Sequence, residues 1–286
     1  MPIALHLPQI STNVRLIASR LLAAELAGAW AERLFLTPPK GGDGAASALD
    51  LIDARGGYVV HKGRHIMTWR WGAADAPAVL LAHGWGGRAA QMRAFVFPLL
   101  AAGYSVIAYD QPAHGLSEGR LTGLPDFADV LGEIAAHYGA HHGQVRAVIG
   151  HSLGATAAAM AHAWNRIELG KIVLISPPSD LVGYSRRFAR WHWMPEALRR
   201  AMQGAIEERY GVRWEELELA RIAPRLAAKA LVIHDRDDRM VPWKQGNAVA
   251  QHWRGARLMT TQGLGHGRIL QDAAVTAAAA DFIAAR

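Results

Sequence analysis

The sequence predicts an α/β domain in which a mostly parallel central sheet is covered by helices on both faces and carries a helical insertion. Short apolar runs alternate with segments of helical spacing along most of the 286 residues, as expected where helices connect parallel strands. Hydrophobic residues make up 51% of the chain and charged residues 19%, which is enough apolar material for a buried core. This length suits one large domain with an inserted subdomain.

The first part of the chain, residues 1–57, is predicted to hold a helix and a linker. A helical pattern covers Val14–Leu36, and the Gly/Ala-rich stretch Gly41–Ala48 is typical of a loop. Five charged residues interrupt the helical pattern, too many for a membrane-spanning helix. Such a helix more often packs on its own protein or on a partner subunit than on a membrane surface. We therefore expect packing, with membrane-surface contact and an oligomer left as alternatives.

Residues 58–176 and 227–286 form the predicted core. A hairpin comes first, with a strand on each side of the turn Gly63-Arg64, and apolar strands then alternate with helices. The strands are Tyr58–Lys62, His65–Trp71, Ala78–Ala82, Ser105–Tyr109, Val145–Ile149, Lys171–Ile175, Ala230–His234 and Ala256–Thr260, and the helices are Ala89–Ala102, Leu124–Tyr138, Leu153–Trp164, Trp243–Trp253 and Ile269–Ala285.

Residues 177–226 interrupt this alternation, because no clear strand occurs there. The segment is rich in Arg and Trp and has a helical pattern over Glu196–Tyr210, so it is a predicted helical insertion between two strands of the sheet. Its run Trp191-His192-Trp193-Met194 has two interpretations. These side chains either line an apolar pocket or pack the insertion onto the core, since Trp buries a large area in either place.

The composition excludes several functions. The chain has no cysteine, so disulfides, thiolate metal sites and a cysteine nucleophile are excluded, and a reducing, cytoplasmic location is favoured. The net charge of +7 is scattered without a basic run or a recognised nucleic-acid motif, which argues against a nucleic-acid partner. The histidines and carboxylates lack the spacing of a zinc site. We expect neither a metal nor a cofactor.

The strongest motif is Gly150-His151-Ser152-Leu153-Gly154, which follows a predicted strand and precedes an alanine-rich helix. A G-x-S-x-G sequence in this context is typical of a nucleophile elbow, in which a strained turn lifts the serine oxygen clear of the sheet. The helix behind the turn directs its positive end toward developing negative charge. The alternative, a glycine-rich turn with an N-capping serine, is less consistent with this context.

With this motif the chain resembles the α/β-hydrolase fold family, over about Tyr58 to Arg286. The resemblance implies that the loop His83-Gly84-Trp85-Gly86-Gly87 supplies one oxyanion-hole donor, the Trp85 N–H, and that the Leu153 N–H supplies the other. The block Asp110-Gln111-Pro112-Ala113-His114-Gly115-Leu116-Ser117 is similar to a loop that braces the oxyanion loop in the family. Asp110 and His114 are therefore expected to be structural rather than catalytic.

The family order of nucleophile, acid and histidine assigns the remaining catalytic residues. His266, flanked by glycines after the last predicted strand, is the implied general base. Asp238 is the implied acid, because Asp238-Arg239-Met240-Val241-Pro242 has the family spacing. Asp235 and Asp237 in the same cluster stay as alternatives, and so does Asp180, because some members place the acid after the preceding strand.

These motifs predict a serine hydrolase that cleaves a small to medium, largely apolar carboxylic ester through an acyl-enzyme intermediate, without a cofactor. A thioesterase, lactonase, amidase or C–C hydrolase would use the same triad. Haloalkane dehalogenases and epoxide hydrolases of this fold use an aspartate nucleophile, which Ser152 disfavours. A ligand-binding or signalling protein with slow or no turnover is the alternative from another class.

Overall fold

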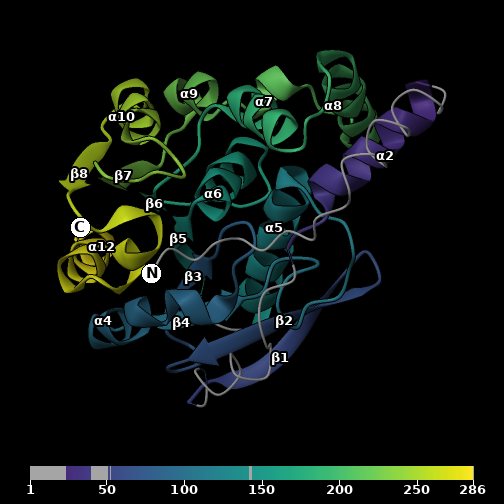
Figure 1. Cartoon of the computed structure of the whole chain (residues 1–286). Helices are drawn as coiled ribbons and strands as arrows, with labels where there is room; N and C mark the ends of the chain where they lie inside the picture. Colours follow the sequence, from purple (N-terminus) through teal and green to yellow (C-terminus); the bar gives the residue numbers. More distant parts are fainter. Residues whose placement is uncertain (1–23, 40–50, 52, 142–143, 286) are drawn as a thin grey trace.

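The computed structural model describes residues 24–39, 51, 53–141 and 144–285, and its centre is a sheet of eight strands (Figure 1). The strand order is β1-β2-β4-β3-β5-β6-β7-β8. From β4 onward in this order every pair is parallel, whereas β2 is antiparallel to both of its neighbours. The strands are β1 (Arg55–His61), β2 (Arg64–Trp71), β3 (Ala78–Ala82), β4 (Ser105–Tyr109), β5 (Val145–His151), β6 (Lys171–Ile175), β7 (Lys229–Asp235) and β8 (Arg257–Thr261).

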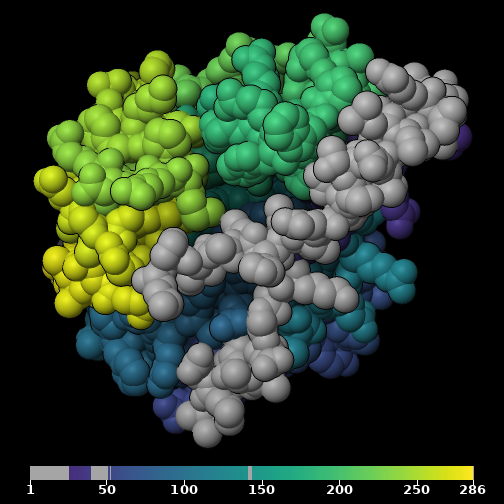
Figure 2. Space-filling view, viewed as in Figure 1, coloured from purple at the N-terminus to yellow at the C-terminus, as the bar shows by residue number. Residues whose placement is uncertain are grey.

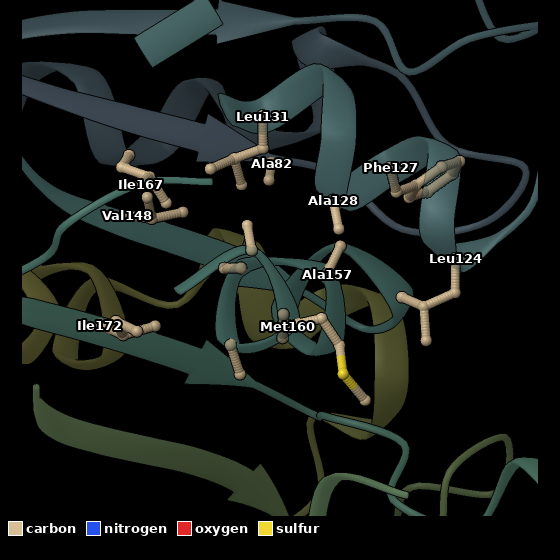
Figure 3. Close-up of a cluster of buried hydrophobic side chains, with 14 of the residues drawn as sticks. Ala82, Leu124, Phe127, Ala128, Leu131, Val148, Ala157, Met160, Ile167 and Ile172 are labelled. Atoms are coloured by element: carbon tan, nitrogen blue, oxygen red, sulfur yellow. The ribbon is translucent and has the colours of Figure 1, made fainter. Parts of the chain in front are cut away.

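Helices cover both faces of this sheet, as the sequence predicts. One face packs against α5 (Leu124–His141), α6 (Leu153–Ala163) and α10 (Trp243–His252), and the other against α4 (Val96–Ala101) and α12 (Ala273–Ala284). Alternate residues of each strand enter the two cores, so that Leu80 of β3 faces α5 and α6 while Leu81 faces α4 and α12. Figure 3 shows the first core, where Ala128 and Leu131 of α5 lie across from Ala157 and Met160 of α6.

The segment between β6 and β7 is helical. It contains α7 (Leu181–Trp191), α8 (Glu196–Tyr210) and α9 (Leu219–Ile222) with the 3₁₀ turns η2 (Trp214–Leu217) and η3 (Ala223–Arg225). Figure 2 shows α7 and α8 as a green layer above the sheet domain.

The N-terminal helix α2 (Ala24–Leu36) packs along α8, as Figure 1 shows. A Cβ on Gly28 would lie 3.2 Å from Ala201 Cβ, and Glu32 forms an ion pair with Arg209. Phe35 adds edge-to-face and tilted ring contacts with α7 and η2. The described part of the helix therefore packs on the protein itself, while residues 14–23 of the predicted helix and the predicted loop 41–48 lie outside the described residues.

Three predicted elements differ in detail from those in the structure. The hairpin turn is Lys62-Gly63 rather than Gly63-Arg64, with φ of 49° and 73°, a left-handed pair that favours glycine at the second position. The predicted helix 89–102 is divided into η1 (Ala89–Phe95) and α4, since Pro98 lacks an N–H and fits only the first turn of an α-helix. The predicted helix 269–285 is divided into η4 (Ile269–Gln271) and α12 by Asp272, whose side chain caps α12.

None of the helices in the described part of the chain has both the length and the apolar character that crossing a bilayer requires.

Candidate active site

Ser152 stands in a strained turn between β5 and α6. Its φ of 52° and ψ of −125° lie in a region that residues with a side chain rarely adopt, and its N–H donates to Ile175 O at 2.8 Å. The flanking glycines have no room for a side chain. A Cβ on Gly150 would lie 2.5 Å from Ala155 Cα, and one on Gly154 would lie 2.3 Å from His83 O. The close approach of neighbouring backbone atoms therefore requires glycine at both positions.

The loop after β3 lies directly against this serine. A Cβ on Gly84 would be 2.7 Å from Ser152 Cβ and 3.3 Å from Ser152 Oγ, so only glycine allows the approach. The backbone N–H groups of Trp85 and Leu153 have no acceptor within the described residues. Two backbone donors beside a serine oxygen are the arrangement that an oxyanion hole needs.

Two buried histidines hold this loop. His83 Nε2 accepts the Gln111 N–H at 2.8 Å, so its Nδ1–H donates to Gly84 O at 2.7 Å. His114 Nε2 accepts the Gly86 N–H at 2.9 Å, and its Nδ1–H donates to Pro112 O. Burial lowers the pKa of His114 to about 4 and that of His83 well below its ordinary value. Both rings therefore brace the loop as neutral groups.

Asp110 is also structural. Its Oδ1 accepts the Ala89 N–H at 2.7 Å and its Oδ2 accepts the Leu116 N–H at 2.8 Å, which ties the start of η1 to the following loop. Burial raises the pKa of this carboxyl despite the two backbone hydrogen bonds. These contacts fit the bracing role expected for Asp110 and His114.

Asp238 and His266 form a hydrogen-bonded pair. His266 lies in the short helix α11 (Gly265–Arg268), and its Nδ1–H donates to Asp238 Oδ2 at 2.7 Å. Asp238 Oδ1 accepts the N–H groups of Met240 and Val241, each at 2.9 Å, and the Asp238 side chain is fully buried. Burial alone would raise the pKa of Asp238, but hydrogen bonds from His234 and His266 outweigh it and lower the pKa. The carboxylate thus stays ionised and orients the imidazole.

The other three candidate acids make different contacts. Asp235 accepts hydrogen bonds from Thr261 Oγ1 at 2.7 Å and from the Leu264 N–H at 3.1 Å, which hold the loop after β8. Asp237 accepts the Gly263 N–H at 2.9 Å. Asp180 caps α7, because its Oδ1 accepts the Gly183 N–H. Only Asp238 contacts His266.

His151, which the sequence analysis did not single out, lies against His266 and directly precedes Ser152 in the chain. The rings of His151 and His266 lie 4.6 Å apart, and the His151 Nε2–H donates to His266 O at 2.9 Å. Burial lowers the pKa of His151 to about 3, so it acts as a neutral donor. No hydrogen bond joins Ser152 Oγ to His266 in the described residues. Catalytic hydrogen bonds commonly tighten only once a substrate is bound.

His234, at the end of β7, is a second residue that the sequence analysis missed. Its ring is fully buried, and its Nε2–H donates to Val241 O at 2.9 Å and lies 3.5 Å from Asp238 Oδ2. It therefore holds both the acid and the loop that carries it. A histidine four residues before the candidate acid was the available signal, but its orientation depends on tertiary packing.

Trp191 and Trp193 of the insertion fit neither interpretation, whereas Trp214 is buried in the core. Trp191 is 63% exposed and Trp193 is 78% exposed, so they neither pack on the core nor enclose a pocket. His192 lies against Phe188, with ring centroids 4.3 Å apart, and Met194 packs against the core.

Three of the buried histidines, His83, His114 and His151, predict a pH-dependent stability. His83, His114 and His151 stay neutral in the folded protein at pH values where the unfolded chain protonates its histidines, near 6.5. The unfolded state then binds more protons, so stability falls as the pH decreases, by about 1 kcal/mol per pH unit for each histidine between about pH 6 and pH 4. Urea unfolding at several pH values measures this dependence. His114→Gln should reduce the slope that these three histidines contribute by about one third, and a flat profile would contradict the assignment.

The described residues contain no group of three or more histidines and carboxylates that could hold a metal ion.

Comparison with known proteins agrees with this fold. A model of the Alpha/beta hydrolase family matches residues 79–279. The putative carbamate hydrolase RutD of Variovorax paradoxus is 27% identical over 252 residues, which cover 71% of this chain and 90% of that protein. The magnesium-chelatase 30 kDa subunit of Rhodobacter capsulatus is 38% identical over 90 residues, 30% of each chain.

Solved structures give the same result. The esterase Pf2001 of Pyrococcus furiosus superposes with a TM-score of 0.64 at 20% identity, covering 86% of this chain and 98% of that one. Est1E from Butyrivibrio proteoclasticus has a TM-score of 0.64 at 15% identity, covering 80% and 97%. The family model spans well over half of the sequence, and the chain belongs to the α/β-hydrolase family.

Proposed function

We propose that the protein is a serine hydrolase that cleaves small to medium, largely apolar carboxylic esters. The observation that carries this proposal is the 2.7 Å hydrogen bond from His266 to the buried Asp238, next to a serine in a strained elbow. A cytoplasmic location, favoured by the lack of cysteine, and a cap role for residues 177–226 belong to the same proposal.

The mechanism has two steps. In the first, His266 takes the proton of Ser152 as the serine oxygen attacks the ester carbonyl, and the N–H groups of Trp85 and Leu153 bind the oxyanion. His266 then gives the proton to the leaving alcohol, and an acyl-enzyme remains. In the second, water activated by His266 releases the acid. Asp238 keeps the imidazole in the required tautomer throughout.

The test combines labelling with turnover. A fluorophosphonate probe should modify Ser152, located by mass spectrometry, and block hydrolysis of p-nitrophenyl acetate, butyrate and octanoate. The order of kcat/KM among these esters gives the acyl length that the site accepts. Turnover without labelling at Ser152 would place the nucleophile elsewhere.

A ligand-binding protein with little turnover is the second candidate. The observation in its favour is that Ser152 and His266 share no hydrogen bond in the described residues. The same experiment separates the two functions, because a folded chain that neither labels nor turns over any of the esters would support the binding protein.

A further inference from the structure

A basic cavity opens beside the candidate catalytic pair. It has a volume of about 740 Å³, and both Asp238 and His266 contribute to its lining. Three arginines also line it: Arg236 and Arg239, from the loop after β7, and Arg268, from α11. Arginines from this loop and from α11 thus line one cavity next to the candidate general base.

Two of the arginines are held in place. Arg268 donates from Nε to Leu264 O at 3.2 Å and from Nη2 to Gly263 O. The Arg236 guanidinium lies over the Trp243 ring, 4.7 Å from its centroid. Such contacts fix a guanidinium group before a ligand arrives, which lowers the entropy cost of binding.

The three arginines of this cavity form no ion pair with the described residues. No carboxylate in the described residues lies within ion-pair distance of the three arginines, and Arg239 forms no hydrogen bond there. Asp237 is the one exposed carboxylate of the lining, and it accepts the Gly263 N–H. Asp238 is fully buried, and its oxygens are turned to His266 and to backbone N–H groups. The lining therefore contains three arginines and one exposed carboxylate.

The place of the cavity indicates which part of a substrate it meets. In an acyl transfer the histidine donates its proton to the leaving-group oxygen, so the alcohol part of the ester must lie beside His266. A cavity lined by His266 is then on the leaving-group side. An arginine guanidinium group can bind a carboxylate through two parallel hydrogen bonds.

We propose that this cavity binds a carboxylate on the alcohol part of the substrate, so that the preferred esters have a negatively charged leaving group. This inference depends on the proposed esterase function. It adds a substrate class to that function, since the acyl part stays apolar while the leaving group carries the charge.

The test compares two esters with the same acetyl group. 4-Acetoxybenzoate has a carboxylate on its leaving group, and methyl 4-acetoxybenzoate has none. We expect Arg239→Gln to lower the ratio of their kcat/KM values by about three- to tenfold, and the double variant Arg239→Gln/Arg268→Gln to lower it further. Because the ratio is taken within one protein, a loss common to both esters cancels.

Four controls make the result specific. Arg64→Gln, which removes an exposed arginine on the β1–β2 hairpin, should leave the ratio unchanged, and Arg239→Lys should restore part of it. Higher ionic strength should reduce the preference of the wild type. Phenyl hemisuccinate, with its carboxylate on the acyl side, should respond to the variants like the neutral ester.

The outcomes separate this inference from the proposed function. If wild type and Arg239→Gln have the same ratio, or if the hemisuccinate responds as 4-acetoxybenzoate does, the leaving-group carboxylate site is wrong and the esterase stands. If neither acetate ester is hydrolysed although the chain is folded, the esterase fails, and the carboxylate site fails with it.

Discussion

Ser152→Ala is expected to lower kcat for p-nitrophenyl butyrate by four to six orders of magnitude, to about the level that oxyanion donors and substrate binding alone supply. The hydroxyl is the atom that would form the acyl-enzyme, and no other side chain can replace it. Because Ser152 Oγ makes no hydrogen bond in the described residues, the variant should unfold at nearly the same temperature as the wild type.

The matched control is Ser105→Ala, which also removes one hydroxyl. Ser105 lies at the start of β4 and donates to Ala76 O, so its loss should affect stability rather than kcat. A Ser152→Ala protein that keeps more than about one tenth of wild-type kcat would exclude Ser152 as the nucleophile.

Asp238→Asn is expected to lower kcat by about 10⁴-fold, with a much smaller change in KM. An asparagine cannot fix the tautomer that leaves His266 Nε2 free to accept the serine proton, nor stabilise the imidazolium that forms. Steady-state kinetics on the same ester measure both constants.

Asp235→Asn is the decisive comparison, since it makes the same chemical change three residues away. Asp235 holds Thr261 and Leu264 rather than His266, so its replacement should cost about 1–3 kcal/mol in the free energy of unfolding. The kcat of the Asp235→Asn variant should differ from that of the wild type by less than about tenfold. The reverse result, with Asp235→Asn the more damaging for kcat, would exchange the roles of the two carboxylates.

The sheet could be predicted closely because its strands are bounded by residues that end them. Three strands have the bounds that the sequence predicts: Ala78–Ala82, Ser105–Tyr109 and Lys171–Ile175. Each is a mainly apolar run that has glycine, proline or polar residues near both of its ends. The long helices on either side follow from the same alternation. Errors occurred where one residue changes the helix type, as at Pro98 and Asp272.

The candidate site was predictable where its geometry is local. Gly150, Gly154 and Gly84 are glycines because neighbouring atoms leave no space for a Cβ, and this constraint appears directly in the sequence. His151 and His234 were missed because their partners come from other segments. The hydrogen bond from His151 to His266 spans 115 positions in the chain, and no local pattern indicates it.

The exposed tryptophans show the limit of composition as a guide. Tryptophan usually buries its large apolar surface, but Trp191 and Trp193 are 63% and 78% exposed at and just after the end of α7. Residue type alone does not indicate which side of the insertion a tryptophan lies on.

The packing of α2 on α8 has a consequence for synthesis on the ribosome. Helix α2 is made early, but Ala201, which Gly28 contacts, is about 170 residues further along the chain, or roughly 10–30 s later at ordinary translation rates. During this interval the side of α2 that packs on α8, with Ala27 and Ala31 buried in the finished protein, lacks that partner. We therefore expect the docking of α2 onto α8 to come late in biogenesis.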